Sequence, residues 1–146
     1  NDDIMVEQLD SINIGEHFPI YARYIEQRHS DGDMYPPSRR QFEDFLGNAW
    51  ECTQFLEFRL GDQLIGCAVI DIIHNGLSAI YTYFDPAFSE RGLGVLAILV
   101  EIDMAQRLGL EYLYLGYWIS GCDKMEYKTK YRPIELYRQN SWGIAE

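Results

Sequence analysis

The segment QLIGCAVIDIIHNGLSAIYTYF (residues 63–84) predicts the centre of the fold. Its two halves are rich in β-branched and aromatic residues, and they flank Asn75-Gly76, a dipeptide that tight hairpin turns favour. A similar run, TQFLEFRL (residues 53–60), is joined to the segment through a Gly-Asp turn. Because three strands connected by tight turns form an antiparallel meander, we expect one sheet here.

A long apolar helix is predicted after the meander, and it leads to a further strand of the same sheet. Residues 91–110, RGLGVLAILVEIDMAQRLGL, repeat apolar positions near a 3.6-residue spacing, and Gly109 suits the helix C-cap. EYLYLGYW (residues 111–118) then predicts a further strand. A strand reached through a helical crossover joins its sheet in parallel. The chain is therefore predicted to be an α+β protein with a mixed α/β sheet, in which the antiparallel meander is followed by a long helix and a parallel crossover strand.

Shorter helices are predicted near both ends of the chain. Residues 19–29 carry apolar positions at helical spacing after a proline that suits a first helical turn. A capping-box signature at Ser38 and Gln41 predicts a helix over residues 39–46. We expect Pro133 to open a final short helix.

The composition indicates one soluble domain spanning residues 1–146. The chain is 47% hydrophobic and 24% charged, which excludes a disordered protein. The longest apolar run is far shorter than the ~18 residues that a membrane span needs, so we expect no membrane partner. The three cysteines form no CxxC pair and the three histidines lack ligand spacing, so we expect no metal site. Without a visible secretory leader, reduced thiols predict a cytoplasmic protein.

Positive charge is concentrated in residues 124–138. Five lysines and arginines and two glutamates give this segment a charge of +3, so the remainder of the −11 chain carries −14. Lys124, Lys128 and Arg132 recur at a spacing of four, and tyrosines such as Tyr127 lie between them. Cations interleaved with rings suit the end of a single-stranded nucleic acid, and they would also bind a carboxylate. The alternative is a solvated basic face.

The tyrosine-rich strand offers hydroxyl groups beside this basic segment. Strand alternation sends Tyr114 and its even-numbered neighbours to one side and Tyr117 to the other. A slot lined by hydroxyls would suit a flexible polar substrate, whereas filling of the core is the alternative. Asp71 and Asp85 lie at strand ends, where a carboxylate could take a proton from an amine or could simply stabilise a turn.

Two glycines, Gly92 and Gly94, open the long helix and leave backbone N–H groups for an anion. The joint is similar to the R-x-x-G-x-G/A phosphate-binding turn of GNAT-like acyltransferases, but Leu96 stands in place of the second glycine. A complete pyrophosphate clamp is therefore not expected.

Four segments carry a wider resemblance: DGDMYPPSRRQFEDFL, IDIIHNGLSAIYTYFDP, LGVLAIL and YLYLGYWISGCDKMEYKTKYRPIELY. Together they resemble the C-terminal domain of the arginyl-tRNA–protein transferase family, and within it the bacterial aspartate/glutamate leucyltransferases. The resemblance implies a GNAT-like fold. It implies transfer of leucine, or of arginine as in eukaryotic relatives, from charged tRNA to an N-terminal Asp or Glu, which marks a protein for degradation. It also implies the transferase domain alone, without the cysteine-containing N-terminal domain of the family.

The resemblance implies roles for the candidate residues. Aminoacyl-tRNA is itself the activated co-substrate, so no further cofactor is expected. Asp85 would accept the amine proton, and Tyr114 or Tyr117 would stabilise the oxyanion or protonate the leaving ribose oxygen. Contacts to the tRNA 3′ end and to the acceptor are expected from Arg39, Asp71, Ser78, Tyr81, Lys124, Tyr127, Lys128 and Arg132.

Two other functions are compatible with the same residues. The fold would permit an N-acetyltransferase that uses acetyl-CoA, although the incomplete glycine turn counts against it. A module that binds acidic N-termini without modifying them would need only the basic segment.

Overall fold

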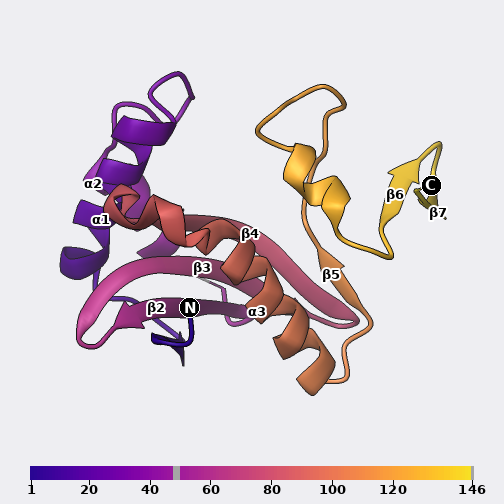
Figure 1. The fold of residues 1–146 in the computed structure, drawn as a ribbon, viewed down its shortest axis with the longest axis horizontal. Helices are drawn as coiled ribbons and strands as arrows, with labels where there is room; N and C mark the ends of the chain where they lie inside the picture. Colours follow the sequence, from indigo (N-terminus) through magenta and orange to yellow (C-terminus); the bar gives the residue numbers. More distant parts are fainter. Residues whose placement is uncertain (48–49, 146) are drawn as a thin grey trace. The chain divides into compact units, whose positions relative to one another are not determined.

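The computed structural model describes residues 1–47 and 50–145 (Figure 1). The chain divides into two compact units, Asn1–Tyr114 and Leu115–Glu146. The first unit contains the main sheet with its helices, and the second contains the basic segment and the C-terminal hairpin. The sequence predicts one domain over residues 1–146, and the structure contains two compact units in this range. We describe each unit by itself.

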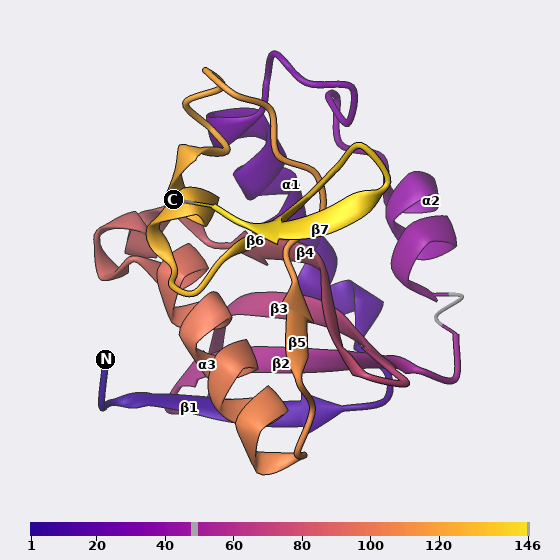
Figure 2. The ribbon, with the colours of Figure 1, turned by 90° about the vertical axis from the view of Figure 1, so that its right-hand side faces the viewer.

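A five-stranded sheet forms the centre of the first unit (Figure 2). Four strands pair antiparallel in chain order, and β5 joins β4 in parallel, which confirms the predicted meander and crossover. The strands are β1 (Ile4–Leu9), β2 (Thr53–Leu60), β3 (Gln63–Ile73), β4 (Gly76–Phe84) and β5 (Tyr112–Tyr114). The sequence analysis missed β1, an edge strand whose four central side chains are all exposed and therefore lack apolar alternation.

Helices cover both faces of this sheet. The long helix α3 (Leu93–Arg107) packs Leu93, Ala97 and Met104 into a cluster with side chains from one sheet face. On the other face, α1 (Ile14–Arg28) and α2 (Arg39–Phe42) contribute to a second cluster that contains Phe55 and Tyr83. Each large apolar side chain buried in these clusters contributes about 1.5–3 kcal/mol to folding.

The observed helices differ from the predicted ones at their ends. Asn13 caps α1 by accepting a hydrogen bond from the Glu16 N–H, so Pro19 lies inside the helix and the predicted start is wrong. Ser38 caps α2 as predicted, and α2 continues into a π-helical turn, η1 (Glu43–Gly47). A 3₁₀ helix, η2 (Pro86–Arg91), leads from β4 to α3.

The second unit differs most from the prediction. It contains a 3₁₀ helix, η3 (Glu126–Lys130), and a hairpin of β6 (Glu135–Arg138) and β7 (Ser141–Ile144). The final helix expected after Pro133 is therefore wrong, because these residues pair as a strand. The strand expected over residues 111–118 is also too long, since only Tyr112–Tyr114 pairs with β4. Gly116 takes a positive φ of 75°, which interrupts the extended backbone.

No helix among the described residues has the length and apolar character that crossing a bilayer needs.

Candidate active site

Three polar residues predicted from the sequence form a row across neighbouring strands. In the sheet register, Asp71 of β3 lies opposite Ser78 of β4, and Ser78 lies beside Tyr114 of β5. Asp71 accepts a hydrogen bond from the Thr53 hydroxyl (2.6 Å). Because Leu77 is buried in the cluster under α3, alternation along β4 turns Ser78 to the opposite face of the sheet. We call Asp71, Ser78 and Tyr114 the polar row.

The start of β4 and the strand β5 approach each other so closely that only glycine fits there. A Cβ atom on Gly76 would lie 2.5 Å from the Tyr112 carbonyl oxygen and 2.9 Å from Cε2 of Tyr114. The Tyr114 hydroxyl donates a hydrogen bond to Oδ1 of Asn75 (3.3 Å). The turn predicted at Asn75-Gly76 therefore also fixes the position of Tyr114.

Tyr81 lies further along β4 and belongs to an aromatic group. Its ring contacts those of Tyr21, Tyr24 and Tyr83, and the side chain is partly buried against the cluster under α1. Burial raises the pKa of Tyr81, so the phenol keeps its proton at neutral pH. The hydroxyl can therefore donate a hydrogen bond to a substrate oxygen but cannot serve as a phenolate base.

Asp85 is buried at the start of η2 with both carboxylate oxygens in use. Oδ1 accepts a hydrogen bond from the Ala87 N–H (3.1 Å), and Oδ2 forms an ion pair with Arg23 of α1 (2.6 Å). Burial alone would raise the pKa of Asp85, but the bonds from Arg23 and Ala87 outweigh it, and the pKa falls below its ordinary value. The group is therefore ionised and connects η2 to α1.

Two arginines near predicted anion contacts are also ion-paired. Arg39 on α2 pairs with Glu43 (2.9 Å). Arg91 forms a two-bond ion pair with Asp3 (2.8 Å for each bond). Gly92 caps α3 with a φ of 63° and supplies no side chain. Gly92 therefore marks the start of α3, and the neighbouring Arg91 is already paired with a carboxylate of the same chain.

In the second unit, Lys128 contacts the backbone of the tyrosine-rich segment. Its Nζ donates a hydrogen bond to the Tyr117 carbonyl oxygen (2.7 Å), and burial lowers the pKa of Lys128. Gly116 lies beside this contact, since a Cβ there would meet Nζ at 3.9 Å, an ordinary van der Waals distance. The Tyr117 ring is 90% exposed. Lys128 therefore helps to hold the loop that presents the Tyr117 phenol to solvent.

The three cations that recur at a spacing of four do not lie on one helix. Only Lys128 lies within η3, whereas Lys124 precedes this helix and Arg132 follows it. The Arg132 guanidinium donates to the carbonyl oxygens of Thr129 and Tyr131, so it folds back over the end of η3. Lys124 is exposed, and Tyr127 is 39% exposed. The lysine and arginine predicted to bind anions thus remain at the surface of the unit.

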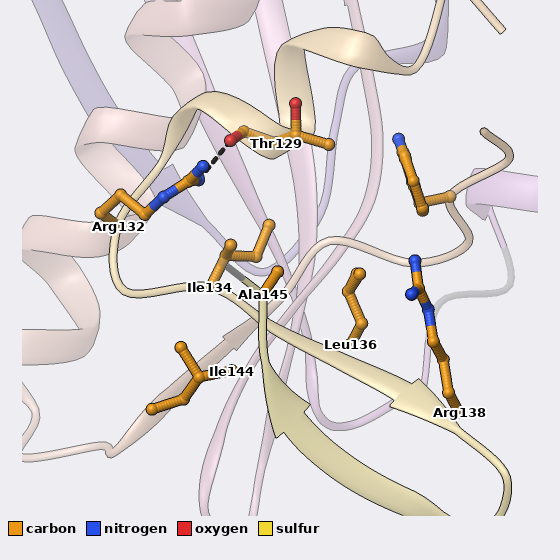
Figure 3. A pocket seen from close by; sticks show the side chains of 8 residues that line it. Thr129, Arg132, Ile134, Leu136, Arg138, Ile144 and Ala145 are labelled. Carbon is orange, nitrogen blue, oxygen red and sulfur yellow. Dashed lines mark hydrogen bonds between the residues drawn. The ribbon is translucent and has the colours of Figure 1, made fainter. Parts of the chain in front are cut away.

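A hollow of about 300 Å³ in the second unit brings the predicted Arg132 together with Arg138 and Trp118, which the sequence analysis did not predict as site residues. Figure 3 shows Arg132 on one side and Arg138 on the other, with aliphatic side chains between them. The Arg138 guanidinium lies over the Trp118 ring, 5.7 Å from its centroid. No sequence signal marks this arrangement, because both arginines come together only through the unpredicted hairpin.

A buried polar network in the first unit was also missed. His17 lies between the Tyr83 hydroxyl and the Glu57 carboxylate, 2.7 Å from each. Glu57 also pairs with Arg59 (2.7 Å), which contacts Glu16 through two bonds. Tyr83, His17 and Glu57 are at most 2% exposed. This Tyr–His–Glu chain therefore connects α1 with β2 and β4 rather than contacting a substrate.

No group of three or more histidine, cysteine or acidic side chains in the described ranges is arranged to hold a metal ion.

Solved structures with the same fold include acetyltransferases. The ribosomal-protein-S18-alanine N-acetyltransferase from Escherichia coli matches 86% of this chain and 75% of its own, with a TM-score of 0.64 and 16% identity. A PaiA N-acetyltransferase from Thermoplasma acidophilum, solved with coenzyme A, matches 95% of each chain with a TM-score of 0.61 and 16% identity. These structural matches establish the GNAT-like fold and confirm that prediction. Because the sequence identity is only 16%, they say nothing about activity.

Sequence relatives are far more similar. The chain is 51% identical over 143 residues to an aspartate/glutamate leucyltransferase from Saccharophagus degradans, and 54% identical over 144 residues to one from Pseudomonas fluorescens. These matches cover 97% and 99% of the chain but only 61% of each relative. Residues 16–138 match the family described as "Arginine-tRNA-protein transferase, C terminus". The chain belongs to this arginine-tRNA-protein transferase family, and its similarity to the bacterial leucyltransferases confirms the predicted branch.

Proposed function

We propose that the chain is the transferase part of an enzyme that moves leucine from charged tRNA to an N-terminal Asp or Glu of a protein. The observation that carries this proposal is the identity of 50% or more to named leucyltransferases over almost the whole chain. The product would carry a new N-terminus that directs the protein to degradation. Charged tRNA is a cytoplasmic reactant, so we place the activity in the cytoplasm.

The reaction is an aminolysis of an ester. The acceptor α-amine attacks the leucyl carbonyl carbon, an amide bond forms, and the ester bond to the tRNA ribose breaks with transfer of a proton to the ribose oxygen. An α-amine with a pKa of about 7.7–8.0 is partly deprotonated at neutral pH. Orientation of the two reactants can therefore supply much of the rate, and the ester needs no further cofactor.

The polar row is the part of the first unit best suited to this chemistry. Tyr114 brings a hydroxyl group beside Ser78 in the register, and Asp71 supplies a carboxyl group in the next strand. The phenol could donate to the developing oxyanion or protonate the leaving ribose oxygen. Tyr117, which is exposed, is the alternative phenol, and Asp85 is the alternative proton acceptor.

A transfer assay separates this function from its rivals. The chain is incubated with leucyl-tRNA and peptides that begin with Asp, Glu or Lys, and the peptide masses are measured. We expect one leucine residue to be added to the Asp and Glu peptides only. The full-length Pseudomonas fluorescens relative serves as a positive control for the reagents.

Two results would overturn the proposal. Addition of an acetyl group from acetyl-CoA, without transfer from leucyl-tRNA, would identify an N-acetyltransferase. Saturable binding of acidic N-termini without any mass increase would identify a binding module. Transfer from arginyl-tRNA in place of leucyl-tRNA would retain the reaction and correct the donor.

A further inference from the structure

The hollow of the second unit is electrostatically unusual in this chain. Six arginines are ion-paired with carboxylates: Arg23, Arg39, Arg40, Arg59, Arg91 and Arg107. Within residues 1–47 and 50–145, neither Arg132 nor Arg138 forms an ion pair. Among the residues that the structure describes, no acidic side chain lines the hollow. Two unneutralised guanidinium groups therefore border one small cavity.

The two guanidinium groups are held in place by neutral contacts. Arg138 lies over the Trp118 ring, and Arg132 donates to the carbonyl oxygens of Thr129 and Tyr131. These contacts restrict both side chains without using their charge, so less entropy is lost when an anion binds. Trp118 also has a buried indole N–H that finds no acceptor in the described part of the chain.

Apart from Thr129 and Trp118, the rest of the lining is aliphatic. Ile134 and Leu136 lie between the two arginines, and Ile144 also lines the hollow (Figure 3). A ligand that fits this hollow needs a planar anionic group and a short apolar stem. A carboxylate on one or two methylene groups has both features, and the fork of a guanidinium binds it through two bonds.

We propose that this hollow binds the side chain of the acidic N-terminal residue of the acceptor protein, with its carboxylate on Arg132 and Arg138. This inference rests on the proposed function and assigns one of its two anionic reactants. The structure favours a carboxylate over the tRNA 3′ end because bases need open rings to stack on. The Trp118 ring already carries a guanidinium, and no second aromatic ring among the described residues lines the hollow. The same positive charge would repel an N-terminal Lys.

Peptide binding tests the inference directly. Fluorescein-labelled peptides that begin with Glu, Gln or Lys and are otherwise identical are titrated with the chain, and anisotropy is recorded. We expect the Glu peptide to bind most tightly, because Gln has the same shape without the charge. Arg132→Gln and Arg138→Gln should each weaken binding of the Glu peptide roughly 10- to 100-fold, the effect of losing a charge-assisted hydrogen bond. Binding of the Gln peptide should change little.

Lys130→Gln is the matched control. Lys130 lies in η3 of the same unit and its loss removes the same charge, but its side chain does not line the hollow. We expect this variant to bind the Glu peptide as the parent chain does. Circular dichroism spectra and melting temperatures of the three variants verify that each remains folded. Arg138→Glu adds a gain-of-function arm, because it should shift the preference toward the Lys peptide.

Each other outcome contradicts the inference. Equal binding of the Glu and Gln peptides, absence of Glu-peptide binding, or an equal loss in Lys130→Gln would show that the hollow does not select the carboxylate. A loss of binding to a CCA-ended oligonucleotide with unchanged peptide binding would assign the arginines to RNA. The transfer assay keeps the two proposals apart. If both arginine variants catalyse transfer with an unchanged KM for the acceptor, the carboxylate site is wrong but the proposed transferase function stands. If the chain binds acidic peptides selectively without transfer, the proposed transferase function is wrong but the carboxylate site stands.

Discussion

Glu101 on α3 is an acidic side chain placed in the core. It is 1% exposed, and its Oε2 has no hydrogen-bond partner within the described residues. Burial raises the pKa of Glu101 to about 8, from 4.5 for an ordinary glutamate. Between these two values the folded protein keeps a proton that the unfolded chain releases, so the free energy of unfolding falls as the pH rises. The stabilisation is complete below pH 4.5 and is lost at about pH 8.

We therefore expect Glu101→Gln, which keeps the shape and removes the ionisation, to abolish this pH dependence. The variant should be more stable than the parent chain at pH 8, by on the order of a few kcal/mol, with little difference near pH 5. Urea unfolding at a series of pH values measures the effect. Glu90→Gln on the exposed surface of η2 is the control, and parallel pH profiles of the parent chain and Glu101→Gln would contradict the expectation.

Asp85 is predicted to accept a proton from the amine, but in the structure it pairs with Arg23, which is distant in sequence. Because Arg23 and Ala87 occupy its two oxygens, we expect Asp85→Asn and Arg23→Gln to lower the free energy of unfolding by similar amounts, about 1–2 kcal/mol. Both variants should then reduce transfer to a similar extent, as judged by kcat and KM for the acceptor. A decrease in kcat confined to Asp85→Asn would instead support the hypothesis that Asp85 is the proton acceptor.

At the scale of the elements, local signals predicted the meander and α3, and non-local pairing decided the rest. The hairpin signalled by Asn75-Gly76 and the helix end near Gly109 need only local backbone chemistry, and both are observed, although the turn residues are His74 and Asn75 and Gly76 already belongs to β4. The β6–β7 hairpin turns through Gln139 and Asn140 with φ values of 50° and 63°, a conformation that Asn-Gly would have signalled and Gln-Asn does not. Pro133 favours a helix start when only the local sequence is considered. The strand that pairs with residues 135–138 cannot be identified from those residues alone.

The same division holds for the candidate site. Strand ends and alternation indicated Asp71 and Tyr114, and the register places both beside Ser78. Arg138 could not be predicted, since it reaches the hollow through the hairpin. Alternation also failed for Tyr117, because the positive φ of Gly116 ends the strand before it. A regular period predicts orientation only while the backbone remains regular.

The contact between β4 and β5 gives a prediction at this scale. Gly76→Ala would place a methyl group 2.5 Å from the Tyr112 carbonyl oxygen, so β5 must move away from β4 and carry Tyr114 with it. We expect a loss of about 2–4 kcal/mol in stability, measured by urea unfolding. Gly94→Ala is the control for stability, because a Cβ there meets nothing within 4 Å and alanine favours the helix. Equal stability of the two variants would show that β5 yields without cost.

At the scale of the whole molecule, charge separates the two units. Residues 124–138 carry +3 in the second unit, and the remainder of the chain carries −14. An acidic surface repels a polyanion, so under the proposed function we expect this chain to contact tRNA mainly through the basic segment. This distribution favours recognition of one RNA end over binding along the length of the RNA.

The dependence of tRNA binding on salt tests this limit. A protein that neutralises Z phosphates loses affinity with a logarithmic slope of about −0.9Z, and the basic segment has five positive residues. If Arg132 and Arg138 hold the acceptor, three lysines remain for phosphates, and we expect a slope of about −3 when the association constant for charged tRNA is measured at increasing salt concentrations. All five cations together would give a slope no steeper than about −4.5. Removing one phosphate contact, as Lys124→Gln would do, should make the slope shallower by about 1, whereas Arg107→Gln on α3 should leave it unchanged. A slope near −8 would require phosphate contacts well beyond residues 124–138 and would contradict a small, end-specific RNA site.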